Sequence, residues 1–395
     1  MKSVLGALAV LAVLLTGCTS QVRGSAIPPT AAPSSPTPTP TTAAPEVPVQ
    51  QAVMESHRMG VHVIDPGDVL THLGSGCFPD GPYPTPKETA AIVLGPDTEK
   101  FLVRSGYVAG WFQCFQVEEK NGRGGVVGMM EAYDEAHAGQ LVSALGFSGI
   151  HPGSQAIDLP GLPDATVVRY PNFDKQPVIW AFQRTGRVIS YAYTDVKSGG
   201  DAAVPAIRDT VTKLLKAQIA KTAGFTPTPV DKLGALDDDP QLLDGKLAQP
   251  EGDPDYWNGG YSAETYPAIA GDPDRELPLL KHNGFTEMYR KEGSGHGYRV
   301  GMIFALPDVK SAKRVFAGRV QQIKAPPTPK ELPAPKQMKD VYCYLTNAGS
   351  TGGQACVFRA GRYFLQLAIF NGPDKGRKTT ALTGMIHKQL ALTPQ

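Results

Sequence analysis

The chain has 395 residues, of which 41% are hydrophobic and 19% are charged, so most of it is expected to fold around buried cores. At roughly 150 residues per domain, this length predicts two or three domains. The formal net charge is only +1. A nearly neutral chain has no general attraction for polyanions, so a nucleic-acid partner is not expected.

The first seventeen residues have the pattern of an export signal. Lys2 supplies a positive charge, and Val4–Leu15 is an apolar run too short to span a bilayer. The run ends in Leu-Thr-Gly-Cys, with the cysteine at position 18, which resembles the lipobox of bacterial lipoproteins. The resemblance implies cleavage before Cys18, attachment of diacylglycerol to its thiol and acylation of the new amine, since two or three chains anchor a protein stably. An ordinary secretory signal or an uncleaved leader is the alternative.

Residues 18–50 are predicted to be an unstructured tether. Between Pro28 and Pro48 the chain is almost entirely Pro, Thr, Ala and Ser, and it has no aromatic residue. Such a segment cannot bury enough apolar surface to offset its ordering entropy. In the polyproline II conformation, at about 3.1 Å per residue, it would hold a folded domain many tens of Å from the membrane.

Four cysteines follow Cys18, namely Cys77, Cys114, Cys343 and Cys356. An even number in an exported protein predicts two disulfides. Of the three connectivities, Cys77–Cys114 and Cys343–Cys356 are favoured, because each pair lies in one half of the chain. The second pair also flanks a glycine-rich turn between two apolar runs. The alternative is a four-cysteine zinc site, for which no Cys-x-x-Cys spacing is present.

The chain also carries an internal repeat. The tripeptide Val-Gly-Met occurs at 127–129 and again at 300–302. An aspartate follows each copy, Asp134 and Asp308, in the position of a helix N-cap. Apolar residues stand four, seven and eight places after both aspartates, on one face of a helix. Two copies of one domain are therefore predicted.

Both copies continue with strand patterns and a tight turn. Arg-Thr-Gly-Arg at 184–187 matches Arg-Ala-Gly-Arg at 359–362, and each turn joins two apolar runs, which predicts antiparallel pairing. Each copy closes with an amphipathic helix, at Val204–Leu215 and Leu382–Leu390. Strands are predicted at 111–117, 125–131, 166–170, 178–184, 187–194, 299–305, 341–345, 354–359 and 362–370.

These patterns predict an α+β fold with two tandem, internally duplicated domains, each an antiparallel sheet with helices on one face. The expected organisation is a lipoprotein signal peptide at 1–17, the tether at 18–50, and repeat domains at 51–222 and 223–395. This plan resembles a group of uncharacterised lipoproteins of mycobacterial and nocardial cell envelopes. The resemblance implies a location at the cell membrane, lipid-anchored on the extracytoplasmic face, and it carries over no catalytic residue.

The sequence contains no nucleophile elbow, Walker loop or dinucleotide fingerprint. Asp253, Asp255 and Glu264 occupy positions 1, 3 and 12 of a calcium-loop pattern, but Asn258 replaces its required glycine. No catalytic residue, cofactor or metal site is therefore predicted. A catalytic triad assembled from scattered residues is the remaining route to catalysis.

We therefore expect a non-catalytic binding or accessory protein of the cell envelope, held at the membrane by lipidated Cys18. The strand aromatics are expected to form core, and the seam between two related domains is a place for a lipid or other apolar ligand. Two alternatives stay open. One is a cell-wall or lipid hydrolase with scattered site residues, and the other is a docking partner of another envelope protein.

Overall fold

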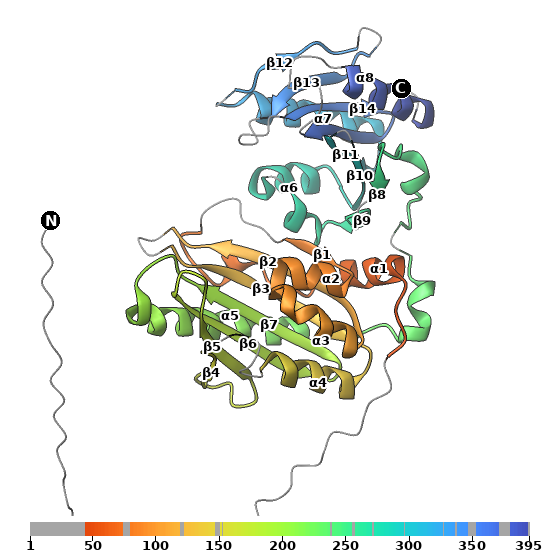
Figure 1. Ribbon diagram of the computed structural model, residues 1–395. Coiled ribbons are helices and arrows are strands. Elements are labelled where there is room, and N and C mark those ends of the chain that lie inside the picture. The colour runs from red at the N-terminus through yellow and green to blue at the C-terminus, as the bar shows by residue number, and fades with distance from the viewer. Residues whose placement is uncertain are drawn as a thin grey trace, which may run out of the picture. The chain divides into compact units, whose positions relative to one another are not determined.

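Two antiparallel sheets, one in each half of the chain, form the framework of the structure (Figure 1). Cys18, Cys77, the signal peptide and most of the tether predicted above lie outside the described residues. Within the described part, no helix is long and apolar enough to cross a bilayer. The computed structural model describes residues 44–395 except 74–79, 119–121, 147–150, 152, 238, 255–256, 271, 296, 327, 336–337, 347–352, 371–379 and 394–395.

The first sheet has seven strands in the order β1-β2-β3-β7-β6-β5-β4, and neighbouring strands run antiparallel. All five strands predicted for this half are confirmed, and the two short strands β1 and β4 are additional. The bounds are β1 Gly81–Tyr83, β2 Tyr107–Gln116, β3 Gly124–Ala132, β4 Gln155–Ala156, β5 Thr166–Pro171, β6 Pro177–Thr185 and β7 Val188–Asp195.

The second sheet follows the order β12-β13-β14-β15-β11-β10-β8, with β9 also paired to β10. The four predicted strands are confirmed. The long strand β10 is not evident from the sequence, because charged residues and glycines interrupt its apolar alternation. The bounds are β8 Asp253–Pro254, β9 Gly259–Ser262, β10 Glu287–Gly295, β11 Gly297–Ala305, β12 Glu331–Leu332, β13 Val341–Thr346, β14 Gly353–Ala360 and β15 Tyr363–Phe370.

Helices cover both faces of each sheet, so the prediction of one covered face is wrong. In the first half, α3 and α4 pack on one face and α5 on the other (Figure 1). In the second half, α6 and α7 pack on one face and α8 on the other. The bounds are α1 Val49–Gly60, α2 Pro86–Glu88, α3 Glu99–Arg104, α4 Glu135–Leu145, α5 Val204–Thr222, α6 Pro273–His282, α7 Val309–Lys324 and α8 Thr380–Leu392.

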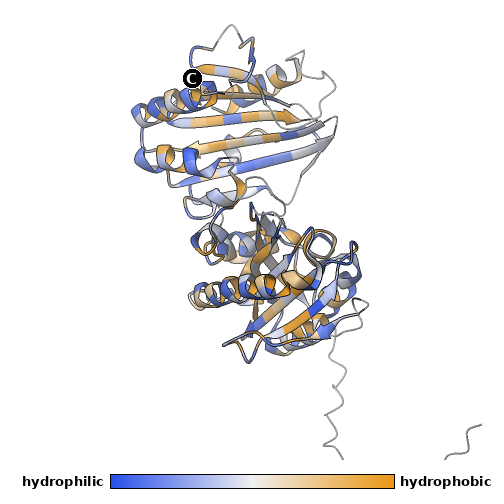
Figure 2. Cartoon of the chain, turned by 90° about the vertical axis from the view of Figure 1, so that its left-hand side faces the viewer, coloured by the Kyte–Doolittle hydropathy of each residue, from blue (hydrophilic) through white to orange (hydrophobic). Residues whose placement is uncertain are grey.

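The strands explain why both faces need a cover. In β6, six consecutive residues from Pro177 to Phe182 are buried. A strand with a solvent-exposed face would alternate apolar and polar residues, whereas one covered on both sides reads as a continuous apolar run. Figure 2 shows apolar residues along the central strands and hydrophilic residues on the outward sides of the helices.

The predicted N-cap residues mark the starts of α4 and α7, the equivalent helices of the two copies. The Asp134 carboxylate accepts a hydrogen bond from the backbone amide of His137 at 2.8 Å, at the start of α4. Asp308 accepts one from the amide of Ser311 at 2.6 Å, at the start of α7. Each carboxylate satisfies an amide that has no partner within its helix.

Helix α1 begins at Val49, two residues inside the predicted tether. Its buried face contains the polar residues Glu55, Ser56 and His57 beside apolar Val53 and Met59. Polar residues are not expected on the inward face of a helix, and no helix was predicted here.

Two equivalent turns fix the alignment of the halves. Gly186 has φ of +59° and Gly361 has φ of +56°, a left-handed conformation that favours glycine. Tyr191 follows Gly186 by five residues, as Gln366 follows Gly361. Tyr191 and Gln366 therefore occupy equivalent positions in β7 and β15.

The internal repeat is confirmed, but its Val-Gly-Met match is one residue out of register. Gly128 lies opposite Tyr191, and Met302 lies opposite Gln366. Gly128 thus corresponds to Met302 and not to Gly301. Because side chains alternate between the faces of a strand, a slip of one residue exchanges the two faces. The sequence match therefore aligned residues that point to opposite sides of their sheets.

Cys343 of β13 and Cys356 of β14 lie opposite each other and form the predicted disulfide. Their oxidation excludes the four-cysteine zinc alternative. Cys114 is also disulfide-bonded, but its partner lies outside the described residues, so the pairing with Cys77 stays a prediction. In the described part of the chain, no group of three or more His, Cys, Asp and Glu residues is placed to hold a metal ion.

Candidate functional site

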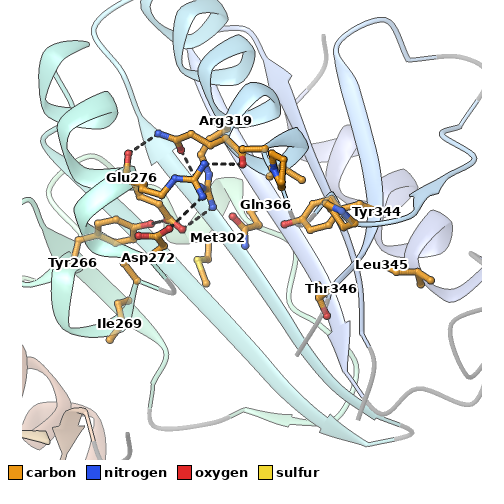
Figure 3. A pocket seen from close by; sticks show the side chains of 17 residues that line it. Tyr266, Ile269, Asp272, Glu276, Met302, Arg319, Tyr344, Leu345, Thr346 and Gln366 are labelled. Carbon is orange, nitrogen blue, oxygen red and sulfur yellow. Dashed lines mark hydrogen bonds and ion pairs between the residues drawn. The ribbon is translucent and has the colours of Figure 1, made fainter. Parts of the chain in front are cut away.

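A cavity of about 440 Å³ opens in the second half, between α6, α7 and the face of the sheet that these helices cover (Figure 3). Met302 of β11, Gln366 of β15 and Tyr344 of β13 line it from the sheet. Residues of α6 and α7 line it from the opposite side, together with Ile269 and the proline-rich segment after α7. This volume is within the range of small-molecule sites, about 300–1,000 Å³.

A buried ion pair joins the two helices above the cavity. The Nη2 atom of Arg319 donates to Oε1 of Glu276 at 2.7 Å, and both side chains are about nine-tenths buried. The hydroxyl of Tyr266 donates to the other oxygen of Glu276. Burial, followed by the nearby Glu276 charge, raises the pKa of Tyr266 well above its ordinary value, so its hydroxyl stays a donor. The carboxylate is thereby satisfied on both oxygens.

A second set of contacts positions the rim of the cavity. The Nη1 atom of Arg319 donates to the side-chain oxygen of Gln322 at 3.0 Å. Gln322 and Arg275 are joined by two hydrogen bonds, Nε2 to the Arg275 carbonyl at 2.5 Å and Arg275 Nη2 to the Gln322 carbonyl at 2.9 Å. Arg275 also lies 3.6 Å from the carboxylate of Asp272. These contacts tie α6 to α7 and fix the direction of the Arg319 side chain.

The sheet side of the cavity offers neutral polar groups. In the part of the chain that is described, the Gln366 amide and the Tyr344 hydroxyl have no hydrogen-bond partner. Figure 3 shows the hydroxyl end of Tyr344 pointing toward Gln366, with Met302 beside them. Burial raises the pKa of Tyr344 above its ordinary value, which keeps this hydroxyl neutral. Both groups can donate and accept hydrogen bonds.

The equivalent space in the first half is filled by aromatic rings. Tyr191 packs against Phe112 and Phe182, with ring centroids 5.9 and 5.3 Å apart. Trp180 packs edge-on to Phe182 at 6.0 Å and to Tyr170 at 5.3 Å. All five side chains are buried. Three of these four contacts are edge-to-face and one is tilted, arrangements that aromatic rings favour in protein cores.

At four equivalent positions, the second copy has a smaller side chain than the first. The strand pairing gives these replacements as Gln366 for Tyr191, Val357 for Phe182, Ala355 for Trp180 and Thr346 for Tyr170. Two other replacements, Tyr344 for Val168 and Met302 for Gly128, add volume, but a cavity remains.

The ion pair is also specific to the second copy. Arg319 stands eleven residues after the N-cap Asp308, and the residue at that place after Asp134 is Leu145. Leu145 is buried in the first core. The second copy therefore has a charged side chain, Arg319, lining a cavity where the first copy has the apolar Leu145 between helix and sheet.

Three rings pack together between the halves, where α1 meets β2 and β9. The ring of His57, from α1, lies 4.4 Å from that of Tyr261 and 6.0 Å from that of Trp111, centroid to centroid. All three side chains are buried. Burial lowers the pKa of His57 to about 3, so it is neutral at physiological pH.

Sequence reasoning alone did not identify the residues around the cavity. Cys343 and Cys356, the predicted disulfide, lie on the same sheet but do not line it. Arg319, Glu276 and Gln366 belong to no known motif. A signal was nevertheless present, because a correctly registered alignment of the two copies shows smaller or more polar residues in the second where the first has large core residues, such as Ala355 for Trp180 and Gln366 for Tyr191.

Comparisons with known proteins add a family match and one weak structural similarity. Residues 42–238 match a family model described as the N-terminal part of a domain of unknown function, DUF7373. No curated protein matches the sequence. The extracellular domain of PknH from Mycobacterium tuberculosis is similar over 41% of this chain and 96% of that one, with 10% identity and a TM-score of 0.28. A similarity at this TM-score carries no argument here. The family match ends before the cavity residues begin.

Proposed function

We propose that this protein is a lipid-anchored binding protein of the cell envelope, and that it holds a small molecule in the cavity between α6, α7 and the second sheet. The observation that supports this most directly is the difference between the copies. The first copy fills the space with Tyr191, Phe182 and Trp180, whereas the second leaves it open and lines it with hydrogen-bonding groups.

The free energy of folding alone does not favour such a space. Packing contacts are lost around a void. A ligand that fills the cavity would restore such contacts and would also form hydrogen bonds with the Gln366 amide and the Tyr344 hydroxyl. Among the described residues that line the cavity, none is a nucleophile paired with a histidine. The hydrogen-bonding groups that are present support binding.

The anchor part of the proposal rests on the lipobox-like sequence at Cys18. A tether of some thirty residues would let the binding domain reach away from the membrane while staying attached to it. Metabolic labelling with a fatty acid tests this part. We expect label on the wild-type protein and none on a Cys18→Ser variant; an unlabelled wild-type protein would contradict the anchor.

The binding part is tested by native mass spectrometry of the full-length protein extracted from the envelope in which it is made. We expect a bound small molecule on the wild-type protein. The variant Gln366→Tyr restores the residue of the first copy, removes the amide and places a ring in part of the cavity, so it is expected to carry much less of such a molecule. A wild-type protein without a bound mass, or equal masses on both proteins, would contradict the proposed function.

A further inference from the structure

The charges around the cavity cancel one another. Four charged side chains line it, and they form two pairs. Arg319 lies 2.7 Å from Glu276, and Arg275 lies 3.6 Å from Asp272. The first pair is buried and the second is about half exposed at the rim. An ion brought beside the buried pair would lose water and find no unpaired opposite charge there, which is unfavourable. The site therefore selects against phosphates, carboxylates and ammonium groups.

A purely apolar molecule is selected against for a different reason. It would cover the Gln366 amide and the Tyr344 hydroxyl, neither of which has a partner within the described residues. Each would then be buried without a hydrogen bond, and that desolvation is not recovered. A fatty acyl chain alone fits this wall of the cavity poorly.

Other parts of the wall require apolar surface on the ligand. Ile269, Met302, Ile323 and Leu345 line the cavity from several directions, and the prolines at 326 and 329 lie at its edge. A highly hydrated molecule without apolar faces would leave these side chains uncovered. The ligand therefore has both an apolar face and neutral groups that donate and accept hydrogen bonds.

We infer that the cavity binds a neutral, polyhydroxylated ring, such as an uncharged sugar unit of an envelope glycan. This inference rests on the proposed function and narrows it. A sugar hydroxyl donates and accepts, as the Gln366 amide and the Tyr344 hydroxyl do together. The C–H faces of a sugar ring are apolar and suit the side chains on the remaining walls. The cavity volume of about 440 Å³ suits one or two such rings.

The inference is tested with the full chain carrying Cys18→Ser, which removes the proposed acylation site. Saturation-transfer NMR would compare three groups of probes. They are neutral sugars (N-acetylglucosamine and cellobiose), charged sugars (glucuronic acid and glucose 6-phosphate), and the neutral apolar dye N-phenyl-1-naphthylamine. We expect saturation transfer to the neutral sugars and markedly less to the other two groups.

Two substitutions locate the binding. Gln366→Leu keeps most of the side-chain volume and removes the amide, so we expect the affinity for a neutral sugar to fall about tenfold, as for the loss of one good hydrogen bond. Gln321→Leu makes the same change on the exposed face of α7 and is expected to leave the affinity unchanged. Leucine is close to glutamine in volume and the cavity wall is partly apolar, so Gln366→Leu is expected to fold. Equal melting temperatures for the two variants verify this.

The outcomes separate this inference from the proposed function. Binding of the apolar dye or of the charged sugars in preference to the neutral ones, with sensitivity to Gln366→Leu, would overturn the inference and leave the binding function standing. Sugar binding that Gln366→Leu does not weaken would also overturn it, because the site would lie elsewhere. If no probe binds and the extracted protein carries no ligand, both proposals fail.

Discussion

Tyr191 and Gln366 occupy the same position in two copies of one sheet, yet one is a buried ring in an aromatic core and the other is an amide facing a cavity. The duplication thus produced a closed copy and an open one. A pair of exchanges between these positions tests whether the difference is responsible for the cavity.

We expect Tyr191→Gln to destabilise the protein by about 3 kcal/mol, because it removes ring contacts and buries an amide in an apolar core. Gln366→Tyr is expected to be neutral or stabilising, since it fills an existing space. Chemical denaturation measures both. If Gln366→Tyr destabilises the protein as much as Tyr191→Gln does, the cavity cannot be explained by the loss of large core side chains from the second copy.

The ion pair between α6 and α7 gives a second prediction. Glu276→Gln leaves the buried charge of Arg319 without its partner and is expected to cost about 3 kcal/mol, as for other broken buried pairs. Adding Arg319→Leu, which restores the type of residue at Leu145 of the first copy, should recover most of that loss. A double variant no more stable than Glu276→Gln alone would contradict this account of the pair.

The disulfide between β13 and β14 gives a third prediction. It closes a short loop, since Cys343 and Cys356 are 13 residues apart, and a loop of this size restricts the unfolded chain by about 3 kcal/mol. The double variant Cys343→Ala/Cys356→Ala should therefore lose about that much stability in denaturant titrations. A loss below about 1 kcal/mol would mean that the strand pairing alone holds this edge of the sheet.

The neutral state of His57 gives a prediction of pH dependence. Its pKa is lowered from 6.5 to about 3 by burial in the fold. As the pH falls below 6.5, the unfolded chain binds a proton that the folded chain does not. Stability is therefore fully present above pH 6.5 and is lost as the pH falls toward 3, by at most about 1.4 kcal/mol per pH unit.

The variant His57→Phe keeps a ring between Trp111 and Tyr261 and removes the titrating group. We expect its melting temperature to fall less than that of the wild-type protein between pH 7 and pH 4.5, because other acidic groups act equally on both. Parallel curves for the two proteins over that range would contradict the burial of a neutral histidine at this seam.

The fold was largely predictable from the sequence because its signals are local. Continuous apolar runs indicate the central strands, and Asp134 and Asp308 mark the helix starts. β10 and α1 were not predicted, since Glu292 in the strand, and Glu55 and His57 in the helix, are buried polar residues. Patterns of hydrophobicity assign such residues to the surface.

The cavity could not be predicted for a related reason. Its residues come from segments about a hundred residues apart, from Tyr266 to Gln366, and none belongs to a motif. A comparison of the two copies reveals the cavity residues, but only when the strands are aligned in the correct register. With Val-Gly-Met aligned by sequence, Gly128 is matched to Gly301; with the strands aligned by pairing, it is matched to Met302 on the cavity wall.

The cavity between α6, α7 and the second sheet is proposed to be a ligand-binding site. The most direct test is a crystal structure of the full-length protein extracted from its own envelope, with no ligand added. The account predicts density for a small molecule between α6 and α7, in contact with the Gln366 amide and the Tyr344 hydroxyl. A cavity closed by rearranged side chains, or a ligand bound elsewhere while this site is closed, would contradict it.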